Sequence, residues 1–370
     1  MKHPKQRLLA LLIVFLGACV SPWWNRPADA QLTLGTYYDA LFYDSRAKRL
    51  EDKKKLDDAG FRRLASVFTA DDAPILDACQ AAGTKVVFAG NATSPEQTKA
   101  YLAKYPCIDA LHIQDDADLA PGGPAALAAK REAARTLIAS VNPPRAILTY
   151  ASFGKGAKPE QWANTADVAH LQLYIYKEGT LRKWYWDYVL AWRAAHQGKL
   201  WVGPYLGKNA TPFFALFPKQ GLPDPVWTAS EYTPVAYNEA ACWAALCAGA
   251  DDLLFYSAFA INSGYPQHYY RISERWDLLP GYKALLARIR KYEPYFAGKR
   301  ETFDKGQLVG ATWTLPGGEK LTVTVDTLEA LPRVDFLETK PVPTPTAKVT
   351  VLPAGVTITA PAGVEFATAP

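Results

Sequence analysis

Two adjacent carboxylic acids, Asp115 and Asp116, directly follow a short apolar segment that begins at Ala110. A catalytic acid needs a pKa above the ordinary value of a carboxyl group, and a neighbouring carboxylate or a pocket of low dielectric constant supplies that shift. The pair therefore suits proton transfer, with Asp116 as the predicted acid and Asp115 beside it. A third acid, Glu178, follows another apolar segment and is the predicted second catalytic carboxylate.

Polar and aromatic side chains recur on one face of several apolar segments. Successive side chains of a strand point to opposite faces, so apolar residues form one face of each segment and polar residues the other. Polar groups are costly to bury, so a barrel interior lined by them indicates a binding pocket. For each residue alone, the alternative to a binding role is a structural side chain that is hydrogen-bonded within the protein. The predicted substrate-binding residues are Tyr37, Asp39, His112, Gln114, Tyr150, His170, Gln172, Tyr174, Trp201, Tyr205 and Tyr256.

These residues must be positioned by eight apolar strands that alternate with helical segments between residues 31 and 297. Alternation of this kind predicts βαβ units, and eight units within about 270 residues match the size of a (β/α)8 TIM barrel. The predicted strands are Leu32–Tyr38, Arg63–Phe68, Lys85–Ala89, Ala110–Gln114, Ala146–Tyr150, Val168–Ile175, Leu200–Leu206 and Asp252–Tyr256. The predicted helices lie near 48–59, 71–82, 94–104, 122–140, 158–164, 182–196, 233–248 and 279–295.

The pattern changes after Arg300, where the helical periodicity ends. Gln307–Thr314 and Lys320–Thr327 flank a Pro-Gly-Gly turn as the strands of a hairpin do, and three further short strands follow. We therefore predict a small β-sandwich-like domain over residues 300–370, which packs against the barrel and contributes no catalytic residue.

Residues 1–30 have the composition of an export signal, in which three basic residues precede the apolar run Leu8 to Ala18. The run is too short to span a bilayer. It closes on Leu16-Gly17-Ala18-Cys19, which resembles the lipobox of bacterial lipoproteins, so Cys19 is the predicted lipidation site and a membrane surface a predicted partner. Cleavage after Ala28-Asp29-Ala30 is the alternative, and it would give a periplasmic or secreted protein.

Charge and cysteine spacing exclude several other classes of function. The formal net charge is +5, but three of the positive residues belong to the signal and no basic cluster remains for a phosphate backbone, so nucleic acid is not an expected partner. Cys79, Cys107, Cys242 and Cys247 lack the paired spacing of a zinc site, and a disulfide between the first two stays open. Since no strand is followed by a nucleotide-binding loop, we expect neither metal nor cofactor.

The chain resembles glycoside hydrolase-like TIM barrels over about residues 31–297. The run from Ala110 to Asp116 is similar to the fourth strand of such barrels, where an acidic pair follows an apolar strand. The run from Tyr232 to Ser257 is similar to their seventh helix and eighth strand. The resemblance implies a general acid after strand four and a nucleophile after strand seven. However, the segment Leu200 to Gly207 carries no carboxylate, which is a departure from the pattern.

The resemblance implies an exported enzyme that hydrolyses glycosidic bonds of poly- or oligosaccharides. The acids Glu178, Asp39, Asp44, Asp71, Asp72 and Glu231 follow other strands or precede helices, and for each alone a solvated loop charge or a helix-start residue is the favoured interpretation. The alternative function is a barrel that binds glycans or cell-envelope material without cleaving it. An esterase is less favoured because the sequence has no Gly-x-Ser-x-Gly elbow.

Overall fold

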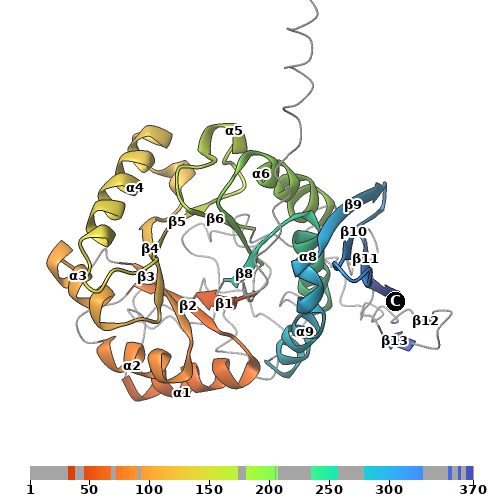
Figure 1. Ribbon diagram of the computed structural model, residues 1–370, viewed down its shortest axis with the longest axis horizontal. Helices are drawn as coiled ribbons and strands as arrows, with labels where there is room; N and C mark the ends of the chain where they lie inside the picture. The colour runs from red at the N-terminus through yellow and green to blue at the C-terminus, as the bar shows by residue number, and fades with distance from the viewer. Residues whose placement is uncertain are drawn as a thin grey trace, which may run out of the picture.

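The chain forms a closed barrel of eight parallel strands. The computed structural model describes residues 32–37, 46–67, 72–89, 93–173, 181–204, 206, 235–256, 279–327, 349–351, 357–359 and 364–369. The barrel strands are β1 (Leu34–Tyr37), β2 (Arg63–Val67), β3 (Lys85–Ala89), β4 (Ile108–Gln114), β5 (Leu148–Phe153), β6 (Val168–Gln172), β7 (Lys199–Gly203) and β8 (Asp252–Phe255). Each strand pairs with the next and β1 pairs with β8, which confirms the predicted TIM-barrel fold (Figure 1).

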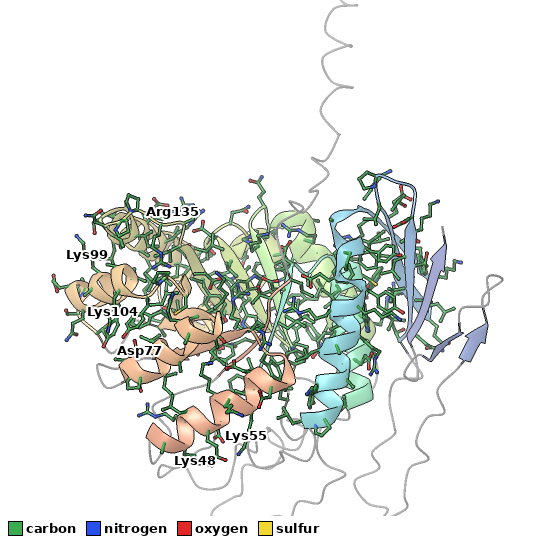
Figure 2. All side chains as sticks on the ribbon, turned by 60° about the horizontal axis from the view of Figure 1, so that its bottom comes forward. Lys48, Lys55, Asp77, Lys99, Lys104 and Arg135 are labelled. Atoms are coloured by element: carbon green, nitrogen blue, oxygen red, sulfur yellow. The ribbon has the colours of Figure 1, made fainter. Side chains whose placement is uncertain are left out.

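Helices surround the barrel and cover the apolar face of the sheet (Figure 1). They are α1 (Arg46–Ala59), α2 (Ala73–Ala82), α3 (Pro95–Lys104), α4 (Gly123–Ala139), α5 (Pro159–Trp162), α6 (Val189–Ala195), α8 (Val235–Ala248) and α9 (Leu279–Tyr292). Helix α3 shows the predicted local start, since the Ser94 hydroxyl accepts from the Gln97 N–H while Pro95 occupies the first turn. Figure 2 shows charged side chains of α1 to α4 that point away from the barrel, namely Lys48, Lys55, Asp77, Lys99, Lys104 and Arg135.

Two differences from the predicted elements bear on the site and on the packing around it. Strand β5 runs to Phe153, three residues beyond the predicted end, because Ala151 and Phe153 continue the buried outer face while Ser152 pairs with His170 of β6. The predicted helix over 182–196 is a π-helical segment, η5 (Leu181–Tyr188), followed by α6. The wide π-helical turn carries a dense aromatic cluster, in which the Tyr185 and Trp186 side chains are buried.

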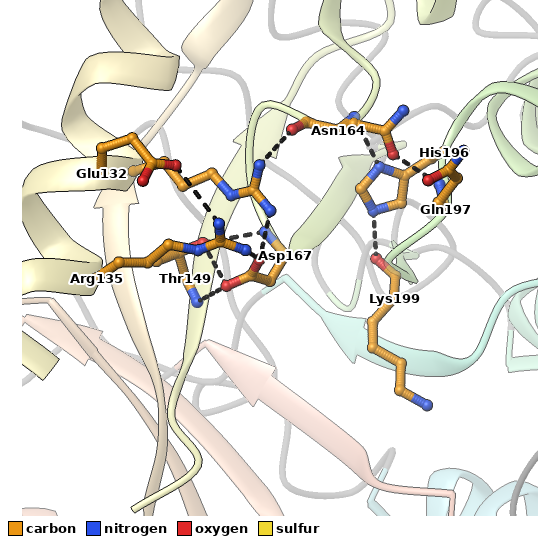
Figure 3. Close-up of polar contacts among 9 residues, drawn as sticks. Glu132, Arg135, Thr149, Asn164, Asp167, His196, Gln197 and Lys199 are labelled. Carbon is orange, nitrogen blue, oxygen red and sulfur yellow. Dashed lines mark hydrogen bonds and ion pairs between the residues drawn. The ribbon is translucent and has the colours of Figure 1, made fainter. Parts of the chain in front are cut away.

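Charged groups tie the strands together at their N-terminal ends. The Asp167 carboxylate, just before β6, accepts from Arg135 at 2.7 Å and from the Thr149 hydroxyl at 2.8 Å (Figure 3). Burial opposes its charge, but these donors lower the pKa of Asp167 to about 2. Nearby, His196 Nδ1 accepts from the Asn164 N–H at 3.0 Å and Nε2 donates to the Lys199 carbonyl at 3.1 Å (Figure 3). These contacts fix the base of the barrel.

The C-terminal strands form a separate antiparallel sheet. Strands β9 (Lys299–Lys305), β10 (Leu308–Thr314), β11 (Lys320–Asp326) and β14 (Val364–Ala369) have the order β14-β11-β10-β9, and β12 (Val349–Val351) pairs with β13 (Thr357–Thr359). The β10–β11 hairpin is the predicted one, whereas β9 was not predicted. The four-stranded sheet lies beside α8 (Figure 1), and Trp313 packs on Phe296 at a ring distance of 5.0 Å. The sheet therefore shares a hydrophobic core with the barrel.

Candidate functional site

The acidic pair lies where β4 ends, at the C-terminal mouth of the barrel. Its geometry depends on a β-bulge, because the register between β4 and β5 shifts between His112 and Gln114. The bulge breaks the predicted alternation: Gln114 turns outward, where its side-chain oxygen accepts from Lys130 of α4. Asp115 takes the inward direction instead. The prediction that Gln114 lines the interior is therefore corrected.

Asp115 is held by two donors from neighbouring strands. The Ser152 hydroxyl of β5 donates to Asp115 Oδ1 at 2.5 Å, and the Gln172 side-chain amide of β6 donates to the same oxygen at 3.0 Å. A carboxylate that accepts two hydrogen bonds from different strands has a fixed orientation. Asp115 therefore presents its second oxygen to the mouth in a defined direction.

Asp116 has a different environment, although it is the next residue. Its backbone has φ 42° and ψ 52°, the left-handed conformation that few non-glycine residues adopt. Its N–H donates to the Ser152 hydroxyl at 2.9 Å, and among the described residues none donates to its carboxyl group. Partial exclusion of solvent by the surrounding protein, together with the charges of Asp115 and Asp118, raises the pKa of Asp116 to about 6. This value is suited to a general acid.

A hydrogen-bonded chain of aromatic residues forms the floor of the mouth. The Leu254 carbonyl can only accept, so His170 Nε2 carries the proton and donates at 3.1 Å. His170 Nδ1 therefore accepts from the Tyr150 hydroxyl at 2.6 Å, and Tyr37 bonds to Tyr150 in turn. Burial lowers the pKa of His170 to about 3 and raises the pKa values of both tyrosines. The floor is consequently uncharged at neutral pH.

His112 and Tyr256 complete the part of the mouth that the structure describes. The His112 ring meets Tyr150 edge-on at 4.9 Å, and its Nε2 is buried without a hydrogen-bond partner among the described residues. Burial lowers the pKa of His112, so the ring is neutral. The Tyr256 ring contacts Tyr37 edge-on at 5.5 Å and stays partly exposed. The flat faces of aromatic rings suit contact with the C–H surfaces of sugars.

Trp201 lies one layer below the mouth. Its ring is 1% exposed, packs on Tyr150 at 5.5 Å, and has the Arg63 guanidinium 4.0 Å from its centroid on the other side. Arg63 in turn donates to Asp109 at 2.6 Å and to Asp252 at 3.0 Å. Trp201 therefore supports the floor and does not line the mouth. Asp252 lies at the start of β8, at the opposite end of the barrel from the mouth.

The structure brings together Tyr37, His112, Asp115, Asp116, Tyr150, His170, Gln172 and Tyr256. Asp39, Tyr174, Glu178 and Tyr205 lie outside the described residues, as do Cys19 and the alternative acids Asp44, Asp71 and Glu231. Asp72 is described and is buried in an ion pair with Arg49, which gives it a structural role at the start of α2.

Sequence reasoning missed Ser152, which contacts both acids. Its signal was present, because Tyr150 and Ser152 continue the inward alternation of β5 beyond the predicted end of the strand. The described ends of β7 and β8, residues 199–204, 206 and 252–256, carry no carboxylate at the mouth. In the described ranges no three His, Cys, Asp or Glu side chains gather as a metal site requires, and no described helix is long and apolar enough to cross a membrane.

The chain is similar to solved glycoside hydrolases in fold. The sequence matches no protein-family model and no curated protein. A variant of AmyP in complex with maltotriose has a TM-score of 0.51 at 9% identity, with 90% of this chain and 94% of that chain covered. Cyclic α-maltosyl-(1→6)-maltose hydrolase from Arthrobacter globiformis has a TM-score of 0.50 at 10% identity, with 90% and 98% covered.

A GH2 β-galacturonidase from Eisenbergiella tayi bound to galacturonate has a TM-score of 0.46 at 13% identity, with 69% of this chain covered. The chain spans about half of the length of that protein, 51%. At these identities the likeness concerns the fold. The chain has a TIM-barrel fold similar to that of known glycoside hydrolases, with an acidic pair at the mouth of its barrel.

Proposed function

We propose that this chain is an exported glycoside hydrolase that cleaves an oligo- or polysaccharide, with Asp116 as the general acid. The observation that carries the proposal is the unequal environment of the two adjacent acids at the end of β4. Asp115 accepts hydrogen bonds from Ser152 and Gln172, whereas the pKa of Asp116 is raised to about 6. A carboxyl group with a raised pKa is what acid catalysis of glycosidic cleavage requires.

The raised pKa decides the direction of proton transfer. With a pKa of about 6, about half of the Asp116 carboxyl groups are protonated at pH 6 and about a tenth at pH 7. A protonated Asp116 donates its proton to the glycosidic oxygen as the bond to the anomeric carbon breaks. The fixed negative charge of Asp115 lies beside the positive charge that develops on the sugar ring. Asp116 thus supplies the proton, and Asp115 stabilises part of the positive charge on the sugar ring.

Hydrolysis also needs a group that attacks the anomeric carbon or activates water. We assign this role to Glu178, in the segment after β6, the strand that also supplies Gln172. Because β6 ends at the same mouth of the barrel as β4, two strands away, the segment that carries Glu178 begins at the mouth that holds the acid. A separation of about 5–5.5 Å between the two carboxyl groups would favour retention, and about 6.5–9.5 Å inversion.

The aromatic floor and the fold likeness guide the choice of substrate class. Tyr37 and Tyr256 place aromatic rings at the mouth, and His112 Nε2 is buried without a hydrogen-bond partner among the described residues. One structure with a similar fold holds maltotriose, and another is named as a hydrolase of a cyclic maltosyl sugar. Neutral glucose oligomers are therefore the first substrates to test, followed by acidic and amino sugars.

The experiment is a turnover screen on a broad panel of oligosaccharides, with wild type and Asp116→Asn. The control is Glu319→Gln, which removes an exposed carboxylate from the C-terminal hairpin. We expect turnover by wild type and the control, and a loss of at least a hundredfold in Asp116→Asn. Binding measured by calorimetry accompanies each assay. Saccharide binding without turnover, equal in wild type and Asp116→Asn, would instead establish the non-catalytic binding barrel.

A further inference from the structure

We propose that Asp118, which lies two residues after the acid, is a positioning residue for Asp116. Its carboxylate holds the acid-bearing turn against the end of β5, and its charge favours the protonated form of the acid. This inference rests on the proposed role of Asp116 as general acid. Asp118 is thus a third carboxylate at the mouth, and its role is to position Asp116.

The first step of the argument is that the Asp116 turn must be held in place. A left-handed conformation at a non-glycine residue is unfavourable, and it persists only where surrounding contacts impose it. After Asp116 the chain forms the 3₁₀ turn η4 (Ala117–Leu119), and the Leu119 N–H donates to the Asp116 carbonyl at 2.9 Å. This short turn contributes one buried side chain, Ala117, so contacts from other elements also help to hold the acid in place.

Asp118 supplies such a contact. Its Oδ1 accepts from the Gly154 N–H at 2.8 Å, across 36 residues of sequence. The carboxylate lies flat against the loop, since a Cβ built on Gly154 would be 3.2 Å from Asp118 Oδ2 and one on Gly156 would be 3.4 Å away. Two glycines therefore leave the space that this carboxylate fills. With Ser152, which accepts from the Asp116 N–H, the turn is attached to β5 at two points.

The loop that receives Asp118 is itself rigid. The Tyr188 hydroxyl of η5 bonds to the Gly154 carbonyl at 2.9 Å and to the Ala157 carbonyl at 2.7 Å. Gly154 is thus held on one side by Tyr188 and on the other by Asp118. Because Tyr188 holds Gly154 in place, the hydrogen bond between Gly154 and Asp118 helps to fix the position of the turn that carries Asp116.

The second step concerns charge. Asp115 and Asp118 flank Asp116, and both raise its pKa in addition to the exclusion of solvent. Other titratable groups of the described residues also lie around this turn. Lys130 of α4 donates to Gln114, and Tyr188 of η5 donates to Gly154. The floor contributes His112, His170, Tyr37 and Tyr150. The histidines and tyrosines are neutral near pH 6, and Lys130 contacts the outward Gln114. Asp118 is consequently a local charge whose removal leaves the floor unchanged.

The test separates position from charge with two variants. Asp118→Asn keeps an oxygen that can accept from the Gly154 N–H but removes the charge, whereas Asp118→Ala removes both. In Asp118→Asn we expect the basic limb of the pH profile of kcat/KM to move to lower pH, with kcat at the optimum preserved. In Asp118→Ala we expect kcat to fall by about tenfold or more with little change in KM, because the acid loses its alignment.

A second readout does not depend on turnover. The pKa of Asp116 is measured by carbon-13 NMR of labelled aspartate carboxyl groups, assigned with Asp116→Asn, in wild type, Asp118→Asn and Glu319→Gln. We expect a lower pKa of Asp116 in Asp118→Asn alone. An unchanged pKa in that variant, or wild-type kcat in Asp118→Ala, would overturn the inference. If no saccharide is cleaved while the NMR shift occurs, the proposed function fails but the electrostatic role of Asp118 stands.

Discussion

Acid should destabilise this barrel through His196, a buried side chain at the opposite end from the candidate site. The Asn164 N–H points at Nδ1 and the Lys199 carbonyl accepts from Nε2, so only the neutral ring satisfies both partners (Figure 3). Burial, together with the neighbouring charge of Arg193, lowers the pKa of His196 to about 4. The folded protein therefore resists protonation at a pH where the unfolded chain accepts a proton.

The magnitude follows from the difference between the two states. An unfolded histidine has a pKa of about 6.5, so the shift to about 4 corresponds to about 3 kcal/mol of stability. Because the folded pKa is the lower one, this stability is fully present above pH 6.5. It is lost progressively as the pH falls from about 6.5 to about 4, since the unfolded state binds more protons over that range.

The assay is urea unfolding followed by tryptophan fluorescence from about pH 7.5 to about pH 4, in wild type and His196→Gln. Glutamine does not titrate, and its amide can still donate to the Lys199 carbonyl. His170 also has a lowered pKa and destabilises both proteins equally in acid. The difference in unfolding free energy between the two proteins therefore isolates His196. We expect that difference to shrink by about 3 kcal/mol on acidification; a constant difference would refute the reasoning.

Three further predictions concern the site, the barrel base and the anchor. Ser152→Ala should lower the free energy of unfolding by about 1–3 kcal/mol, because Asp115 and the Asp116 N–H both lose a hydrogen-bond partner. Ser152→Thr keeps the hydroxyl and should restore most of that free energy in the same urea assay. Arg63→Met should destabilise by about 3–5 kcal/mol, since Asp109 and Asp252 lose their shared cation, and thermal unfolding should show a lower Tm. Cys19→Ser should release the protein from the membrane fraction on cell fractionation; a wild-type protein that is soluble and begins at Gln31 would contradict the lipid anchor.

The sequence predicts the barrel well because its signal is periodic and local. Strand β6, for example, places Leu171 on the outer face and His170 and Gln172 on the inner face, and the structure keeps this pattern. The strand order also follows, since parallel neighbours are joined by single helices. Where the pattern is less regular, as in the aromatic segment Leu181–Tyr188, the sequence locates the element but not its π-helical geometry.

The details of the site could not be predicted in the same way, because they arise from contacts between segments far apart in sequence. Two adjacent acids on a regular strand would point to opposite faces, with Asp116 inward beside Gln114. The bulge reverses this arrangement: Asp115 points to Ser152 and Gln172, and Asp116 follows in a left-handed turn. The register that creates the bulge is set by β5, more than thirty residues later. The different environments of the two acids are therefore a consequence of the pairing between β4 and β5.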